Sequence, residues 1–207
     1  RIRDGKSFTT RRVNAIQNGE AIFSCSISFQ KREKGLNHQI KMPKIQGPEK
    51  LKSDLELRKD LQSKIPKDYL PMWLREREIE TRQVEPVDLL KAEKLPPYRS
   101  TWMKPTGKLP ADERIHQALL LYVSDMGLLG AAVNPHEVNF MSKKFQSASL
   151  DHVMWFHGKV NFNNWILHHM HSPISQNARG FSRGSIYTKS GKLIASTAQE
   201  GLMRIWD

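Results

Sequence analysis

The sequence lacks the features that mark several classes of protein. Its single cysteine, Cys25, excludes a disulfide within the chain and suits a reducing, intracellular compartment. No apolar run approaches the roughly 20 residues needed to span a bilayer, so we expect no membrane insertion. Ser149 does not lie in a Gly-x-Ser-x-Gly motif, which argues against a serine-hydrolase triad of Ser149, Asp151 and His152.

Metal-binding spacings are also missing. His168, His169 and His171 form the densest histidine cluster, and in a strand His169 and His171 would share a face. No cysteine or acidic third ligand stands close to them in sequence. We therefore expect solvated or hydrogen-bonded histidines, no metal and no other cofactor.

Positively charged residues outnumber negatively charged ones. The chain has 33 Lys and Arg against 21 Asp and Glu, which gives a formal net charge of +12. Such a field attracts phosphates, so nucleic acid and a polyphosphorylated molecule such as CoA are both candidate partners, beside a plain solvated surface. No arginine-rich arm, zinc-finger spacing or RNP-like motif accompanies the charge, so we expect no nucleic-acid partner.

Two hairpins are predicted, one near each end of the chain. Strands at about 7–16 and 21–30 meet across Asn18-Gly19, a pair that favours a type I′ turn. Strands at about 178–188 and 192–205 are joined by residues 189–191. Residues 19–25 line up with 191–197, which indicates an internal repeat unless the match is chance. In that alignment Ile22 matches Ile194, and Ile27 matches Gln199.

Residues 111–129 are the clearest predicted helix. Pro110 suits its first turn, and Asp112 and Glu113 suit its positive end. Its apolar residues surround almost the whole helix, so we expect burial on several sides. They comprise a stripe of Ile115, Ala118, Leu119, Tyr122, Met126 and Leu129, widened by Leu120, Leu121 and Val123.

The other segments complete an α+β pattern. We expect a loop at 31–50, an exposed helix at 51–64, and strands at 78–84, 98–104, 146–156 and 165–171. One buried helix followed by several long antiparallel strands predicts a sheet wrapped around that helix.

Several motifs occur in the order typical of one family. The run SLDHVMWFH at 149–157 resembles the signature of acyl-CoA thioesterase II, as do ARGFSRG at 178–184 and ASTAQEG at 195–201. RDGKSF at 3–8 and FQ at 29–30 look like the same family's first domain. The resemblance covers nearly the whole chain and is loosest at 31–97. It implies a double hotdog fold, hydrolysis of fatty acyl-CoA to free acid and CoA, and no metal.

The resemblance also implies an N-terminally truncated chain with three parts. The chain begins at Arg1, in what reads as a strand, so the first hotdog is expected to be incomplete. Residues 1–45 would be its C-terminal strands, 46–94 a linker with a helix, and 95–207 the second, catalytic hotdog. A severed sheet edge would favour homo-oligomers. Relatives are often peroxisomal, although residues 204–207 carry no Ser-Lys-Leu tripeptide.

Motif matching assigns three catalytic residues: Asp125, Ser149 and Gln199. The family implies that they hold and activate a water molecule, and no covalent nucleophile is needed. Asp125 should lie partly desolvated at the edge of the apolar stripe, unless it is a helix-end residue facing water. Gln199 shares a strand face with Ala195 and should point inward, unless it is a strand-end residue bonded to backbone. It also suits stabilisation of the oxyanion.

Other residues near the motifs receive weaker assignments. Ser149 lies on a polar strand face, so the motif alone supports its role. Adjacent residues of a strand point to opposite faces, so Asp151 and His152 are predicted to be structural and not a dyad. Arg179 and Arg183 share one strand face about 13 Å apart and would bind separate phosphates of CoA, unless they form a basic strand edge.

The sequence thus predicts an acyl-CoA thioesterase whose acyl chain lies in an apolar tunnel beside the central helix. A catalytically inactive hotdog module that binds acyl groups or a protein partner is the alternative. A basic nucleic-acid binder is the more remote one, and it predicts steeply salt-dependent binding.

Overall fold

The fold was taken from a computed structural model, which describes residues 2–88 and 90–206. The chain divides into two compact units, Arg1–Gln39 and Ile40–Asp207. The three-part division at 45 and 94 stays a prediction. Strand β4 (Ile79–Gln83), inside the predicted linker, is hydrogen-bonded into the sheet of the larger unit.

The smaller unit is a three-stranded antiparallel sheet of β1 (Arg3–Asp4), β2 (Phe8–Gln17) and β3 (Glu20–Gln30). The predicted hairpin is confirmed. Asn18 and Gly19 have φ angles of 52° and 83°, the positive values that a type I′ turn requires. The pairing register shifts beside Ile16, so that Ile22 is an extra residue in β3 and forms a bulge.

The larger unit contains a seven-stranded antiparallel sheet. Its order is β4-β5-β8-β9-β10-β6, and β7 also pairs with β10. The strands predicted near 78–84, 98–104, 165–171, 178–188 and 192–205 are confirmed. Their observed bounds are β4, β5 (Tyr98–Pro105), β8 (Ile166–Gln176), β9 (Arg179–Thr188) and β10 (Leu193–Ile205).

The prediction of one strand over 146–156 is wrong. The segment forms β6 (Phe145–Ser149) and β7 (Val153–Phe156), which pair with different halves of β10. Between them, the backbone N–H groups of Leu150 and Asp151 both turn to the carbonyl oxygen of Glu200, at 2.9 and 3.4 Å. Because two residues share one partner, the alternation of side chains is interrupted there.

The predicted helix over 111–129 is right at its start and wrong at its end. Asp112 caps α3 (Glu113–Ser124) by accepting a hydrogen bond from the backbone of Arg114. The helix stops at Asp125, and α4 (Leu128–Val133) begins after Gly127, whose φ of 80° is the left-handed conformation that glycine tolerates. The stretch Glu113–Val133 is long and apolar enough to cross a membrane, a property that core helices share.

The predicted burial of the helix is also wrong. Leu120 and Val123 are fully buried, but much of the apolar stripe is exposed, so the helix is not buried on several sides as predicted. Ile115, Tyr122 and Met126 are 42%, 66% and 38% exposed. When a helix is apolar nearly all round, its sequence pattern does not predict which face is buried. That face is determined by the contacts that the helix makes with the sheet.

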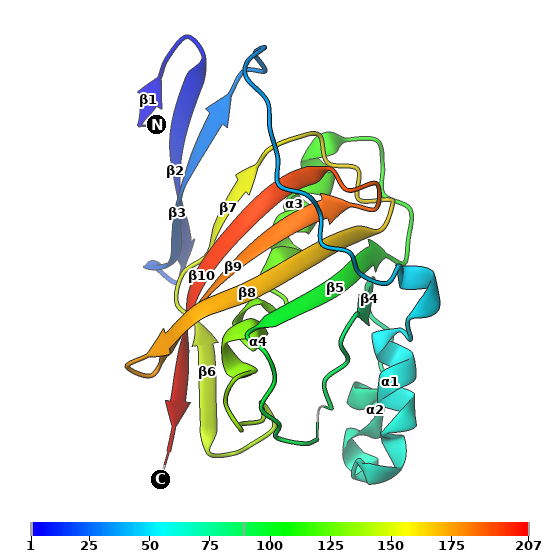
Figure 1. The fold of residues 1–207 in the computed structure, drawn as a ribbon. Helices are drawn as coiled ribbons and strands as arrows, with labels where there is room; N and C mark the ends of the chain where they lie inside the picture. Colours follow the sequence, from blue (N-terminus) through cyan, green and yellow to red (C-terminus); the bar gives the residue numbers. More distant parts are fainter. Residues whose placement is uncertain (1, 89, 207) are drawn as a thin grey trace. The chain divides into compact units, whose positions relative to one another are not determined.

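Both faces of the sheet are packed. The strands curve around α3 and α4 on one side (Figure 1), where Ile166 and Ile186 pack with α3 and Met170 packs with α4. On the other side, Trp102, Leu167 and Tyr187 are covered by the segment that contains Met42 and Ile45. The central strands are therefore a buried, rigid support.

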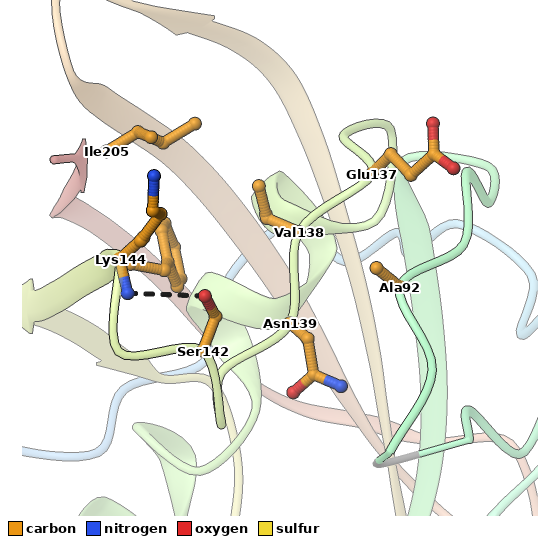
Figure 2. A pocket seen from close by; sticks show the side chains of 8 residues that line it. Ala92, Glu137, Val138, Asn139, Ser142, Lys144 and Ile205 are labelled. Carbon is orange, nitrogen blue, oxygen red and sulfur yellow. Dashed lines mark hydrogen bonds between the residues drawn. The ribbon is translucent and has the colours of Figure 1, made fainter. Parts of the chain in front are cut away.

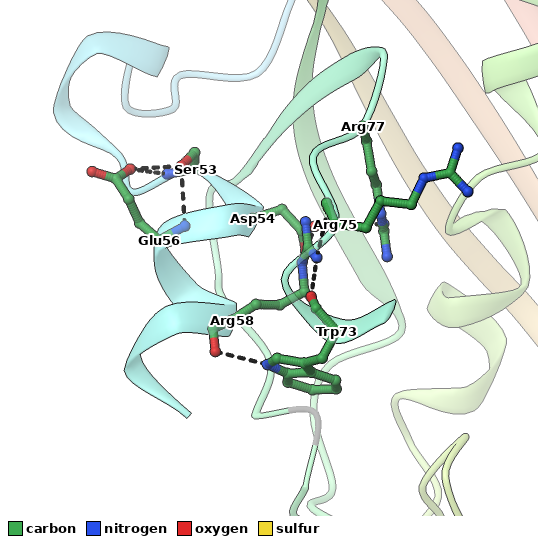
Figure 3. A network of polar contacts seen from close by, with 7 residues as sticks. All are labelled: Ser53, Asp54, Glu56, Arg58, Trp73, Arg75 and Arg77. Atoms are coloured by element: carbon green, nitrogen blue, oxygen red, sulfur yellow. Dashed lines mark hydrogen bonds and ion pairs between the residues drawn. The ribbon is translucent and has the colours of Figure 1, made fainter. Parts of the chain in front are cut away.

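The predicted exposed helix at 51–64 is observed as α1 (Asp54–Asp60), followed by a 3-10 turn at Gln62–Lys64. Arg58 is only 4% exposed, which contradicts the prediction that this helix is exposed. Its guanidinium donates to Asp54 at 2.9 Å and to the carbonyl oxygen of Trp73, at the end of α2 (Leu70–Trp73) (Figure 3). This network fastens α1 to α2. Shorter 3-10 turns occur at Pro48–Lys50 and Lys67–Tyr69.

Candidate active site

Three side chains from three separate elements meet at one carboxylate. Asp125 ends α3, Ser149 ends β6, and Gln199 lies in the middle of β10. The Ser149 hydroxyl donates to Oδ1 of Asp125 at 3.0 Å, and the Gln199 amide donates to the same oxygen. The structure therefore brings together the three residues that the motifs singled out, although their catalytic role stays a prediction.

Local backbone features produce this meeting. The break between α3 and α4 leaves Asp125 as the C-cap residue of α3, directly after its last residue, Ser124. Ser149 pairs with Gly201 in the ladder between β6 and β10, two positions beyond Gln199. The carboxylate at the helix end is thus aimed at neighbouring positions of two paired strands.

The three residues differ in burial. Gln199 is 1% exposed and points inward, as its strand face predicts. Asp125 and Ser149 are exposed, so the expected partial withdrawal of Asp125 from water is wrong. Asp125 lies past the last buried turn of α3, which explains its contact with solvent. The site is a buried amide beneath an accessible carboxylate.

His152 is a fourth member that sequence reasoning missed. Its Nε2 lies 2.7 Å from the hydroxyl of Ser124, and its Nδ1 lies 3.4 Å from Nε2 of Gln199. Burial lowers the pKa of His152, and the negative charges of Asp125 and Asp151 act in the opposite direction. No hydrogen bond between Asp151 and His152 is seen in the described residues, in keeping with the prediction against a dyad. Asp151 instead accepts from the backbone N–H of Glu200 at 2.8 Å.

A band of buried polar side chains extends from Gln199 across the sheet. Nε2 of His168 on β8 lies 3.3 Å from the hydroxyl of Thr197 on β10. Burial lowers the pKa of His168 to about 3. Gly184 makes this contact possible, because a Cβ at position 184 would lie 2.1 Å from Nε2 of His168.

Within the described residues, three buried atoms of this region have no hydrogen-bond partner: Nδ1 of His168, Oγ of Ser182 and Oε1 of Gln199. His169, the next residue of the histidine cluster, faces the other side of β8, and its Nδ1 lies 3.0 Å from the hydroxyl of Ser100. No cluster of three potential metal ligands occurs in the described part of the chain.

The two arginines predicted to bind CoA lie apart from the carboxylate. Arg179 and Arg183 share the face of β9 opposite to that of Ser182, which pairs with Gln199. Arg179 forms an ion pair with Glu200 at 3.3 Å, and the guanidinium of Arg183 lies 5.3 Å from the ring centre of Phe181. Their role in binding stays a prediction.

Two surface hollows were found near these elements. One of about 130 Å³ is bordered by Arg179, Phe181 and Glu200. The other, of about 140 Å³, lies between Ile205 and the segment before β6, where Lys144 and Glu137 contribute to its wall (Figure 2). Asp125, Ser149 and Gln199 line neither, so the hollows give no separate indication of where an acyl chain lies.

A curved antiparallel sheet around a central helix (Figure 1) is the arrangement of the hotdog fold, the class of structure expected for a thioesterase of this type. The comparisons with known proteins lead to the same class. The profile of the family described as acyl-CoA thioesterase matches residues 73–202, more than half of the chain. The chain belongs to the acyl-CoA thioesterase family.

Individual relatives agree. Acyl-CoA thioesterase 2 of Haemophilus influenzae is 35% identical, over 98% of this chain and 71% of its own length. Acyl-coenzyme A thioesterase 8 of mouse is 36% identical, over 99% of this chain and 66% of its own length. The crystal structure of acyl-CoA thioesterase II TesB2 from Mycobacterium marinum superposes with a TM-score of 0.76 at 33% identity, over 100% of this chain and 72% of that one.

These similarities confirm the predicted family, the α+β hotdog fold and the class of enzyme, an acyl-CoA thioester hydrolase. The chain spans roughly two thirds to seven tenths of the length of these relatives.

Proposed function

We propose that this chain hydrolyses fatty acyl-CoA to free fatty acid and CoA, with Asp125 as the general base. The observation that carries the proposal is the convergence of the Ser149 hydroxyl and the Gln199 amide on one oxygen of Asp125. Two donors on Oδ1 fix the plane of the carboxylate and direct its other oxygen, Oδ2, toward an attacking water.

The reaction then follows ordinary thioester chemistry. Oδ2 of Asp125 takes a proton from water as the water oxygen bonds to the carbonyl carbon. The carbon–sulfur bond breaks as the tetrahedral intermediate collapses, and the departing thiolate of CoA takes up the proton. In this arrangement Ser149 and Gln199 orient the base, which refines the expectation that they hold the water themselves.

Asp125 has an apolar neighbourhood suited to an acyl chain. Tyr122 lies one helical turn before it, Met126 follows it, and both are exposed. Ile115 continues the same side of α3 toward the start of the helix. We place the acyl chain along this side, in keeping with the predicted tunnel beside the central helix, and its burial there would favour binding by the hydrophobic effect.

The basic residues of β9 supply the proposed contacts to CoA phosphates. Arg183 and Arg179 are both exposed cations, and Arg179 would exchange its ion pair with Glu200 for a phosphate. Replacing both arginines with alanine should raise KM for acyl-CoA and leave kcat nearly unchanged. An unchanged KM would remove them from the binding site.

The test of the function is the release of free CoA thiol from a panel of acyl-CoA substrates, followed with a thiol-reactive chromophore. Asp125→Asn should lower kcat by roughly 10²-fold or more, as expected when a general base is lost. Asp112→Asn is a matched control at the other end of α3, because asparagine also caps helices well. Equal turnover in the parent chain and Asp125→Asn would refute the assignment.

A non-catalytic role is favoured by one observation, the exposed apolar side of α3. A module that binds acyl groups or a protein through Ile115 and Tyr122 would bind acyl-CoA without releasing thiol. The thiol assay combined with a binding measurement separates the two functions.

We also propose a peroxisomal location for the whole protein and association of copies. The location is supported by the resemblance and by a yeast relative named peroxisomal acyl-coenzyme A thioester hydrolase 1. The association is supported by the unpaired strand edges of the small sheet formed by β1, β2 and β3. Imaging of the tagged full-length protein and light scattering test these two proposals.

A further inference from the structure

The interrupted strand between β6 and β7 places a histidine behind the proposed catalytic residues. Leu150 and Asp151 bind the carbonyl oxygen of Glu200, and Asp151 accepts from the N–H of the same residue. The chain is therefore fastened to β10 immediately before His152. At that point the imidazole reaches both Ser124 of α3 and Gln199 of β10.

The hydrogen bonds of Ser124 determine which nitrogen of His152 carries the proton. The Ser124 side chain is fully buried, and its hydroxyl donates its single hydrogen to the carbonyl oxygen of Leu121 at 2.7 Å. It can only accept from Nε2 of His152, 2.7 Å away. His152 is thus protonated at Nε2, and in the neutral ring Nδ1 is an acceptor.

The acceptor at Nδ1 completes a directed chain of hydrogen bonds. The Gln199 amide has two N–H groups, and these reach Oδ1 of Asp125 and Nδ1 of His152. A reversed amide would set its oxygen against two acceptors at once, which is repulsive. His152 and Asp125 together allow only one orientation of Gln199.

We propose that neutral His152 is a positioning residue that holds the Gln199 amide in the orientation needed to anchor Asp125. The proposal rests on the proposed function and extends it to a residue outside the three matched by motif. Protonation at Nδ1 would turn a donor toward the Gln199 N–H group, and the amide would have to leave Asp125.

The surroundings of His152 keep it neutral near pH 7. The charged or titratable groups that face it are Asp125 at the end of α3, Asp151 beside it in the chain, and His168 on β8. Burial is the largest influence and holds the pKa of His152 below its ordinary value of 6.5. Activity should therefore decline on the acid side as His152 gains a proton.

Two substitutions separate positioning from packing. In His152→Asn the side-chain oxygen lies near the position of Nδ1 and still accepts from Gln199, without titrating. In His152→Gln the amide nitrogen lies near the position of Nε2 and still donates to Ser124, but the acceptor beside Gln199 is lost. We expect kcat within about threefold of the parent for the first and about 10- to 100-fold lower for the second, with KM little changed.

The acid limb of the pH profile is the second readout. In His152→Gln, the acid limb should remain only to the extent that the titration of carboxylates causes it. In His152→Asn, the acid limb should move to lower pH. His157→Gln is the matched control, since this exposed histidine also pairs with a serine, Ser196 at 2.8 Å, and lies outside the site. Equal kcat values for the two His152 variants, or an unshifted acid limb in His152→Asn, would overturn the proposal.

An activity-independent measurement separates this proposal from the function itself. Nitrogen-15 NMR of the histidine rings should show His152 as the Nε2–H tautomer, with a pKa that rises in Gln199→Ala because the neutral ring loses its donor. If the parent chain releases no CoA but shows this tautomer, the proposed function fails and the hydrogen-bond chain stands. An Nδ1–H tautomer would exclude the positioning role.

Discussion

The hairpin β2–β3 and the hairpin β9–β10 have similar local geometry and very different surroundings. Gly19 and Gly191 occupy matching turn positions with φ angles of 83° and 88°. The second strand of each hairpin also carries a bulge, at Ile22 in β3 and at Ile194 in β10. These are the positions that the faint sequence repeat aligned, so the structure supports that repeat.

The two hairpins diverge in burial. Ile194 is 1% exposed and Ile22 is 62% exposed. Gln199 is 1% exposed, whereas its counterpart Ile27 is 39% exposed. The larger unit supplies α3 and α4 to cover its sheet, and residues 2–39 contain no helix. A hairpin's turn and bulge are thus local properties, while burial and chemistry depend on what covers the strand.

The largest expected effect tests burial at the two bulges. Ile194→Ala should lower the free energy of unfolding by about 3 kcal/mol, because it leaves a cavity in the core. Ile22→Ala should change it by less than about 0.5 kcal/mol, as at other exposed positions. Urea denaturation of both variants measures the difference. Similar losses would show that Ile22 is covered in solution.

The next effect concerns chemistry at the matched pair Gln199 and Ile27. Gln199→Ile removes a donor to Asp125 and should lower kcat by roughly 10²-fold. Ile27→Gln, the reverse change in the other hairpin, should leave kcat near that of the parent. Thiol release by the two variants is the measurement, and comparable turnover in both would break the distinction between the hairpins.

The pH dependence of the free energy of unfolding should also arise from a residue of the larger unit. His168 is buried and neutral, with its pKa lowered to about 3, so below pH 6.5 the unfolded chain binds a proton that the folded chain does not. The free energy of unfolding should fall by about 2 kcal/mol between pH 6.5 and pH 5. His168→Gln should flatten this slope, and His38→Gln, at an exposed residue of the smaller unit, should not.

The smallest effect should be the same in both hairpins. Gly19→Ala and Gly191→Ala each place a Cβ at a positive φ, at a cost of about 1 kcal/mol. No severe clash adds to this cost, since the nearest atom to a Cβ at 191 is Met42 Cβ at 3.8 Å and none lies within 4 Å at 19. Melting curves that show a much larger loss at one glycine would contradict a purely local origin.

Much of the fold was predictable because turns and strands are encoded by neighbouring residues. Asn18-Gly19 identified its turn, and alternation identified the inward face of Gln199. The buried face of α3 was not predictable, since nearly every direction around that helix is apolar. The break at Leu150 and Asp151 was also hidden, because both residues suit a strand and the carbonyl oxygen that interrupts it belongs to Glu200.

The sequence by itself determined the family and the two hairpins, and it singled out Asp125, Ser149 and Gln199 as candidates, because motifs and turns depend on residues close together in the chain. Only the tertiary structure decided that both donors bind one oxygen of Asp125, and that His152 stands behind Gln199. Those contacts join α3, β6 and β10 across long stretches of chain, and packing of the helix against the sheet sets their distances.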